Sequence, residues 1–216
     1  MNNLMIGDVA PDFTTHNYTK FEKEKYGAFH LHGYKHGMWC LLASHPADFT
    51  PVCDGELCTM QSMFKEFLKM KVQLVGLSVD SMESHEKWMK QFKEIDNLSF
   101  DFPIIADENR EIATKYGMVR SEQEHTKTVR STFIIDPDNI IRAICTYPAE
   151  VGRDFNEIKR VITALQLSDK HPIATPVNWK EGAEVVVHPS LPKEDYNKVF
   201  PQGTRELKPY LHKVEL

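Results

Sequence analysis

Short apolar runs alternate with amphipathic segments along most of the chain. Five of these runs are rich in branched or aromatic side chains and are typical of buried strands: 38–46, 72–80, 102–107, 131–136 and 140–148. The last two flank the turn sequence Pro-Asp-Asn, so they predict a β-hairpin.

Between these runs, apolar residues recur every three or four positions, which is the spacing of one face of a helix. The pattern predicts helices over 51–70, from about 84 to 95, over 108–117 and from about 154 to 167, the third of them ended by Gly117. A strand, a helix and a strand in that order predict a parallel crossover. The sequence therefore predicts an α/β fold with a mixed central sheet.

The character of the chain changes near His171. The remaining residues are rich in proline and lack sustained periodicity, apart from one β-branched run at 183–189. A disordered tail is disfavoured because such tails carry few aromatic residues, and this segment has Trp179, Tyr196, Phe200 and Tyr210. We expect a main domain over 1–168 and a small extension over 169–216 that packs on the core or on a partner subunit.

Charge and composition exclude several classes of function. The 216 residues are 41% hydrophobic with a formal net charge of -5, so the chain has no basic footprint for nucleic acid or for a membrane surface. No apolar run approaches the ~18 residues of a membrane span, and the N-terminal residues lack a secretion signal. We therefore expect a cytoplasmic protein that binds neither nucleic acid nor membrane.

Four cysteines, Cys40, Cys53, Cys58 and Cys145, are too few for a disulfide scaffold and are expected to be reduced thiols. Cys53 has the most suggestive position. Thr50 and Pro51 match an N-cap hydroxyl and a proline at the first helical position, which places Cys53 third in the helix. Free N–H groups and the positive helix end favour negative charge there.

A thiol with a pKa near ~8.5 needs a decrease of ~2 units, or roughly 3 kcal/mol, to be mostly thiolate at neutral pH. A helix end supplies ~1 kcal/mol, so a cation or a further donor must supply the rest. From the residues alone, Cys53 is either such a nucleophile or a small buried hydrophobe. A zinc site with His45 and Cys58 is disfavoured because the two cysteines lack the usual spacing.

The stretch "PADFTPVC", with Pro46, Thr50 and Cys53, has the P-x-x-x-T-x-x-C pattern of peroxiredoxins. Four further segments resemble the 1-Cys, peroxiredoxin-6-like subfamily in the same order: "LSVDSMESHEKW", "FPIIAD", "YPAEVGRDFNEIKRVITALQL" and "ATPVNWKEGAEVVVHP". The resemblance covers nearly the full length. It implies a thioredoxin-like fold, a mixed central sheet flanked by helices, with a small C-terminal extension, and it implies a thiol-dependent peroxidase.

The resemblance also implies roles for particular residues. Cys53 would attack a peroxide and become a sulfenic acid, Thr50 would hydrogen-bond the peroxide, Pro46 would shield the thiolate, and Arg130 would be the missing cation. His45, Glu56 and Arg153 match the wider network around that site. No cofactor and no metal are implied.

No cysteine follows Cys145, and "IATPVNW" stands where a two-cysteine relative carries its resolving cysteine. We therefore expect an external thiol to reduce Cys53, most simply glutathione, with thioredoxin or a glutathione transferase as alternatives. Cys58 and Cys145 are disfavoured as resolvers, because Cys58 should face another way and Cys145 resembles a core residue, as does Cys40. The resemblance further suggests a homodimer paired through the strand 140–148.

Two other functions are weighed against the peroxidase. Members of this subfamily are associated with a phospholipase A2 activity, but Met38 stands where its serine would be, although the His32 and Asp138 positions are filled. We expect no lipase activity by that route. A redox sensor or chaperone-like protein would use Cys53 as a stoichiometric switch rather than for turnover.

Overall fold

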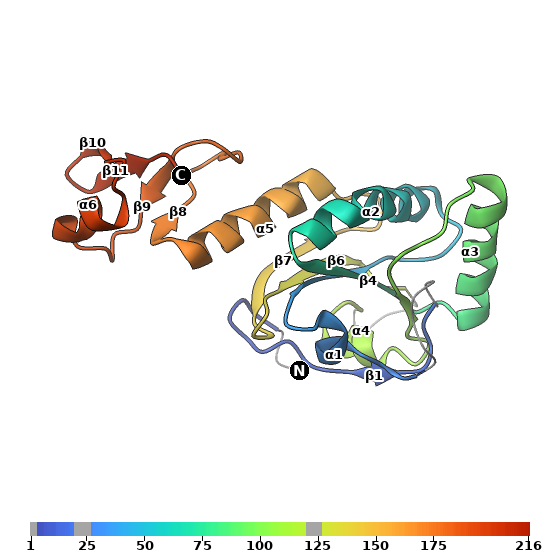
Figure 1. Ribbon diagram of the computed structural model, residues 1–216. Coiled ribbons are helices and arrows are strands. Elements are labelled where there is room, and N and C mark those ends of the chain that lie inside the picture. The colour runs from blue at the N-terminus through green and yellow to red at the C-terminus, as the bar shows by residue number, and fades with distance from the viewer. Residues whose placement is uncertain (1–3, 20–26, 120–126) are drawn as a thin grey trace. The chain divides into compact units, whose positions relative to one another are not determined.

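The computed structural model describes residues 4–19, 27–119 and 127–216, which form two compact units, Met1–Arg153 and Asp154–Leu216 (Figure 1). Among the described residues, no helix is long and apolar enough to cross a membrane.

A five-stranded sheet is the centre of the first unit, within the described residues. Its strands are β3 (Trp39–Ser44), β4 (Val72–Ser78), β5 (Ile104–Ala106), β6 (Arg130–Ile135) and β7 (Ile141–Tyr147). Their order is β5-β4-β3-β6-β7, with β3, β4 and β5 parallel, β6 antiparallel to β3, and β7 antiparallel to β6. The predicted mixed sheet, crossover and hairpin are therefore confirmed, and β7 lies at an edge.

Helices cover both faces of this sheet. They are α1 (Leu31–Lys35), α2 (Pro51–Lys69), α3 (Met82–Ile95) and α4 (Glu111–Lys115), and a short strand pair, β1 (Thr14–Thr15) with β2 (Phe29–His30), precedes them. Helices α1 and α4 lie on one face and α2 on the opposite face (Figure 1). Leu42 of β3 pairs with Val75 of β4 and with Phe133 of β6. All three join the buried cluster that includes Leu31 of α1 and Ile112 of α4.

Two helix starts have clear local causes. The side chain of Ser81 accepts a hydrogen bond from the backbone N–H of Ser84 at 3.2 Å, which caps α3. Helix α4 begins later than the sequence predicts, because the carboxylate of Asp107 accepts hydrogen bonds from the N–H groups of Ile112 and Ala113. Its predicted end is confirmed, since Gly117 follows with φ +63°.

The second unit begins with α5 (Phe155–Lys170), which Asp154 caps through the N–H groups of Asn156 and Glu157. A four-stranded antiparallel sheet follows, made of β8 (Ile173–Ala174), β9 (Val185–Val187), β10 (Arg205–Lys208) and β11 (Leu211–Val214), in the order β10-β11-β9-β8. Two short helices, η1 (Lys193–Asp195) and α6 (Tyr196–Val199), lie between β9 and β10 in the chain.

The observed division lies between residues 153 and 154, whereas the sequence suggested a boundary after residue 168. The difference arises because Ala164 and Leu167 of α5 pack against the buried cluster of the second unit, which contains Trp179 and Phe200. Of the four strands of this sheet, the sequence predicted β9 alone, from the β-branched run at 183–189. Strand β10 is exposed along its length, so it carries no apolar pattern.

Candidate active site

Cys53 occupies the third position of α2 and its side chain is fully buried. Thr50 is the N-cap residue with an extended backbone, φ -116°, and Pro51 takes the first helical position. The N–H groups of a first helical turn have no acceptor within their own helix, and they add to the positive helix end. The predicted helix start is confirmed, and it favours negative charge on Sγ.

The hydroxyl of Thr50 does not cap this helix, which corrects one prediction. Its Oγ1 instead donates to the carbonyl oxygen of Ala47 at 3.0 Å, and the side chain makes no cap hydrogen bond. The only hydroxyl proton is used in this bond, so the oxygen keeps lone pairs to accept a hydrogen bond from a bound peroxide.

Arg130 supplies the cation that the sequence argument required. It is the first residue of β6, and its Nη1 donates to Sγ of Cys53 at 3.3 Å and to Oε2 of Glu56 at 2.9 Å. Its Nε and Nη2 both donate to the carbonyl oxygen of Ala149, at 3.0 and 2.7 Å. The guanidinium is therefore held on two sides, with Nη1 against the sulfur.

Glu56 and Arg153 complete this buried network. Arg153 donates to Glu56 from its backbone N–H and from Nε and Nη2, the last at 2.6 Å. Burial alone would raise the pKa of Glu56, but the hydrogen bonds and charge of Arg153, with the charge of Arg130, lower it. Two arginines around one carboxylate leave a net positive charge beside Cys53.

Comparison with known proteins identifies the family. A model of the AhpC/TSA family matches residues 6–144, and one of the C-terminal domain of 1-Cys peroxiredoxin matches residues 164–203. The chain belongs to the peroxiredoxin family. It is 41% identical over 97% of its length to a 1-Cys peroxiredoxin of Dictyostelium discoideum, of which it covers 84%. It is 40% identical over 94% of its length to Peroxiredoxin-6 of Homo sapiens, of which it covers 92%.

Solved structures agree with this assignment. A yeast mitochondrial 1-Cys peroxiredoxin superposes with a TM-score of 0.88 at 41% identity, covering 99% of this chain and all of that one. Peroxiredoxin 6 of Arenicola marina superposes with a TM-score of 0.87 at 35% identity, covering 99% of this chain and 98% of that one. The predicted thioredoxin-like fold is therefore confirmed, and the chain is a thiol-dependent peroxidase, an antioxidant oxidoreductase.

The surroundings of Cys40 and Cys58 disfavour a thiolate in this peroxiredoxin. Burial raises the pKa of Cys40 to about 12. The pKa of Cys58 is also raised, by partial burial and by the nearby carboxylates of Asp54 and Asp96. Cys145 is half-buried on the edge strand β7, so the prediction that it is a core residue is wrong. Among the described strands β7 pairs with β6 alone, and on its other side Ile141, at its start, bonds the backbone of Gly7 and Asp8.

Pro46 and His45 lie in the loop that joins β3 to α2, and both are buried. Nε2 of His45 bonds Oδ1 of Asp48 at 3.0 Å, and Nδ1 of His85 bonds Oδ2 of the same carboxylate at 2.7 Å. Asp48 and His85 were not among the residues predicted from the sequence, although both lie in segments that carry the resemblance. Their position in the sequence could have indicated them. Each is a polar residue that follows one of the parallel strands β3 and β4, and the carboxyl ends of these strands meet at one edge of the sheet.

His32 and Met38 bear on the phospholipase question. Nε2 of His32 bonds the carbonyl oxygen of Ala10 at 2.9 Å, and its Nδ1 lies 3.8 Å from a carboxylate oxygen of Asp12. The ring thus engages Ala10 and Asp12, whereas Asp138 is exposed at the hairpin turn. Met38 brings no hydroxyl to this region, so the absence of lipase activity stays a prediction.

Proposed function

We propose that Cys53 is the peroxide-reducing thiolate of this peroxidase and that Arg130, Thr50 and Pro46 assist it. The observation that carries the proposal is the contact of 3.3 Å between Nη1 of Arg130 and Sγ of Cys53. His45, Glu56 and Arg153 support these residues, the last two by holding the guanidinium of Arg130 in place.

The first step is a displacement at oxygen. The thiolate of Cys53 attacks the terminal oxygen of the peroxide, so an S–O bond forms as the O–O bond breaks. The peroxide's own proton moves to the leaving oxygen, which departs as water or an alcohol, and a sulfenate remains on Cys53. Nη1 of Arg130 can stabilise the charge that shifts from sulfur to oxygen, and Oγ1 of Thr50 can accept the hydrogen bond of the peroxide O–H.

Substrates are expected to include hydrogen peroxide and organic hydroperoxides. Three apolar side chains of the first unit remain exposed on segments next to Cys53: Phe49 at 51%, Val52 at 38% and Val151 at 46%. Apolar surface at this place favours a hydroperoxide that carries a hydrocarbon group.

The second half of the reaction needs two thiols from outside the chain. One glutathione condenses with the sulfenic acid to give a mixed disulfide and water, and a second displaces Cys53 and leaves as oxidised glutathione. The matching yeast structure comes from a study of thiol resolution through glutathione and thioredoxin systems. We therefore propose glutathione as the thiol that reduces Cys53, with thioredoxin or a glutathione transferase as alternatives.

Turnover with different reductants tests this proposal. One equivalent of hydrogen peroxide should give a sulfenic acid on Cys53 that mass spectrometry detects after trapping. Glutathione, glutathione with a glutathione transferase, and thioredoxin are then compared for sustained peroxide consumption, and the first two are expected to support it. A single stoichiometric burst with every thiol would instead identify a redox sensor.

We also propose a homodimer paired through β7, because no described strand lies along its outer edge beyond Ile141 and such an edge pairs readily with another chain. The chain has a mass of 25.0 kDa, so sedimentation should give about twice that value. Successive N–H groups of a strand alternate between its two sides. One of the two variants Ala143→Pro and Ile144→Pro therefore removes an N–H that points away from β6. That variant should be a folded monomer. If both variants stay folded dimers, pairing through this edge is wrong.

A cytoplasmic location stays a prediction from the sequence. The relative of 45% identity from Saccharomyces cerevisiae is a mitochondrial peroxiredoxin, so mitochondria are the alternative compartment.

A further inference from the structure

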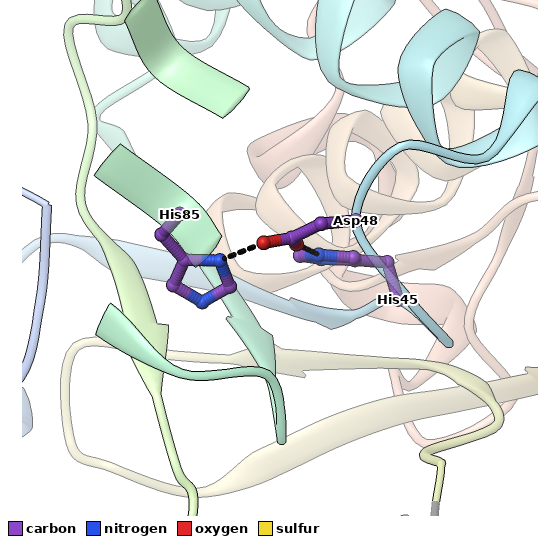
Figure 2. A group of neighbouring side chains, drawn as sticks. All are labelled: His45, Asp48 and His85. Carbon is purple, nitrogen blue, oxygen red and sulfur yellow. Dashed lines mark hydrogen bonds and ion pairs between the residues drawn. The ribbon is translucent and has the colours of Figure 1, made fainter. Parts of the chain in front are cut away.

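A second buried polar cluster lies beside the loop of the proposed active site. It consists of His45, Asp48 and His85, which are 1%, 7% and 0% exposed (Figure 2). His45 directly follows β3, Asp48 lies in the loop before α2, and His85 lies in the first turns of α3. The cluster thus joins the loop that carries Pro46 and Thr50 to another helix.

Asp48 is the centre of this cluster. Its Oδ1 accepts from Nε2 of His45 at 3.0 Å, and its Oδ2 accepts from Nδ1 of His85 at 2.7 Å (Figure 2). The same Oδ2 also accepts from Oγ of Ser84 at 2.8 Å. Its backbone N–H donates to a carboxylate oxygen of Asp80 at 2.7 Å. Burial pushes the pKa of Asp48 upward, but the hydrogen bonds and charges of the two histidines outweigh it and hold the pKa well below its usual range.

An ionised Asp48 fixes where the histidine protons lie. A carboxylate only accepts hydrogen bonds, so Nε2 of His45 and Nδ1 of His85 both carry protons. Nε2 of His85 lies 3.4 Å from the carbonyl oxygen of Ile105. Nδ1 of His45 is buried and has no hydrogen-bond partner in the described structure. Burial lowers the pKa of His45, so the ring is neutral and Nδ1 keeps a lone pair.

The loop that Asp48 anchors is strained. Phe49 has φ +54°, a left-handed conformation that costs free energy for a residue with a side chain. Surrounding contacts must maintain such a residue. The loop also packs on Trp88 of α3, whose ring lies 5.5 Å from His45 and 6.0 Å from Phe49. The bonds of Asp48 therefore hold the turn that delivers Thr50 to the start of α2.

We propose that Asp48 and His85 are positioning residues of the peroxidase reaction. Together they hold the strained loop that carries Pro46 and Thr50, and they fix His45 as the tautomer protonated at Nε2. This proposal rests on the assignment of Cys53 as the peroxide-reducing thiolate. It does not involve the charge on sulfur, because the hydrogen bonds of Asp48 reach neither Cys53 nor Arg130.

The same three side chains also meet a geometric requirement for a metal ion, since one ligand atom from each lies within 4.8 Å of the others. A metal needs nitrogen lone pairs, however, and the nitrogens that face Asp48 hold the protons donated to its carboxylate. We therefore assign the cluster to hydrogen bonding rather than to a metal.

Two reactions of Cys53 in the full-length protein separate positioning from stability. Peroxide reduction depends on the loop, whereas alkylation by iodoacetamide depends mainly on the thiolate. Asp48→Asn is expected to slow reaction with hydrogen peroxide about 10- to 100-fold, the usual cost of losing a group that orients an active side chain. The alkylation rate should change less than about two-fold, because the contact with Arg130 remains.

His85 gives the conservative comparison. The amide of His85→Asn can still donate to Asp48 from near the place of Nδ1, and its peroxide rate should fall less than that of His85→Leu. Asp136→Asn is the matched control, because Asp136 is also a buried, hydrogen-bonded carboxylate but lies beyond the far end of β6 from Arg130. It should leave the ratio of the two rates unchanged.

Each outcome is decisive. Equal losses in both rates for Asp48→Asn, or an unchanged ratio for His85→Leu, would refute the positioning role. A stoichiometric metal in the purified protein, lost on chelation with a drop in melting temperature, would overturn the hydrogen-bond assignment. Wild-type protein that reacts with peroxide at a residue other than Cys53 would refute the underlying assignment instead.

Discussion

Replacing Cys53 with serine is expected to abolish peroxide consumption. A serine hydroxyl is not ionised near neutral pH, and its oxygen cannot take up another oxygen atom to form the equivalent of a sulfenic acid. The side chain is nearly the same size, so the buried site should stay folded. Peroxide consumption is measured with glutathione in excess and should fall to the uncatalysed rate, while the melting temperature stays near that of the wild type.

The double variant Cys58→Ser/Cys145→Ser is the control for this experiment. Both thiols are only partly buried, so the small change in size should be tolerated. Turnover with glutathione should persist, because the proposed cycle takes its reducing thiols from outside. Loss of sustained turnover in the double variant, with sulfenic acid still formed on Cys53, would identify an internal resolving cysteine. Consumption of peroxide by Cys53→Ser at the wild-type rate would disprove the assignment of the nucleophile.

The main sheet was predictable because its strands are local and strongly apolar. Every residue of β3 and of β6 is buried, and β3 and the second half of β6 appear as apolar runs bounded by polar residues. The strands of the second unit were less visible, because β8 has only two residues and β10 is exposed throughout. Their order is set by contacts with distant residues, and such contacts leave little trace in local composition.

The position of Cys53 was likewise predictable, because a threonine and a proline define a helix start within a few residues. The bond of Thr50 to Ala47 was not, since the same hydroxyl could have served either as a cap or in the preceding turn. Arg130 lies 77 residues from Cys53, and no local pattern joins them. Family resemblance supplied that pairing, and the structure shows its physical basis, a guanidinium held by Glu56 and Ala149.

Arg130→Met should slow the reaction of Cys53 with hydrogen peroxide about 10²- to 10³-fold. This is the usual effect of removing one hydrogen-bond donor to a developing charge, and it corresponds to ~3–4 kcal/mol of transition-state stabilisation. The variant loses the hydrogen bond to Sγ and the cation beside it, so the charge that develops in the transition state is less well stabilised. Glu56 remains paired with Arg153 at 2.6 Å, which limits the damage to folding. The rate constant is measured by stopped flow.

Arg130→Lys tests whether charge alone is enough. A lysine is a point charge with one nitrogen and cannot reach Ala149, Glu56 and Sγ together as the forked guanidinium does. Its rate should fall between those of the wild type and Arg130→Met. Arg142→Met is the matched control, because this half-buried arginine pairs with Asp136 at 3.1 Å near the turn of the hairpin. Its rate should stay within about two-fold of the wild type, as expected for distant sites. If the rate of Arg130→Met also stays within about two-fold of the wild type, the helix start alone activates Cys53.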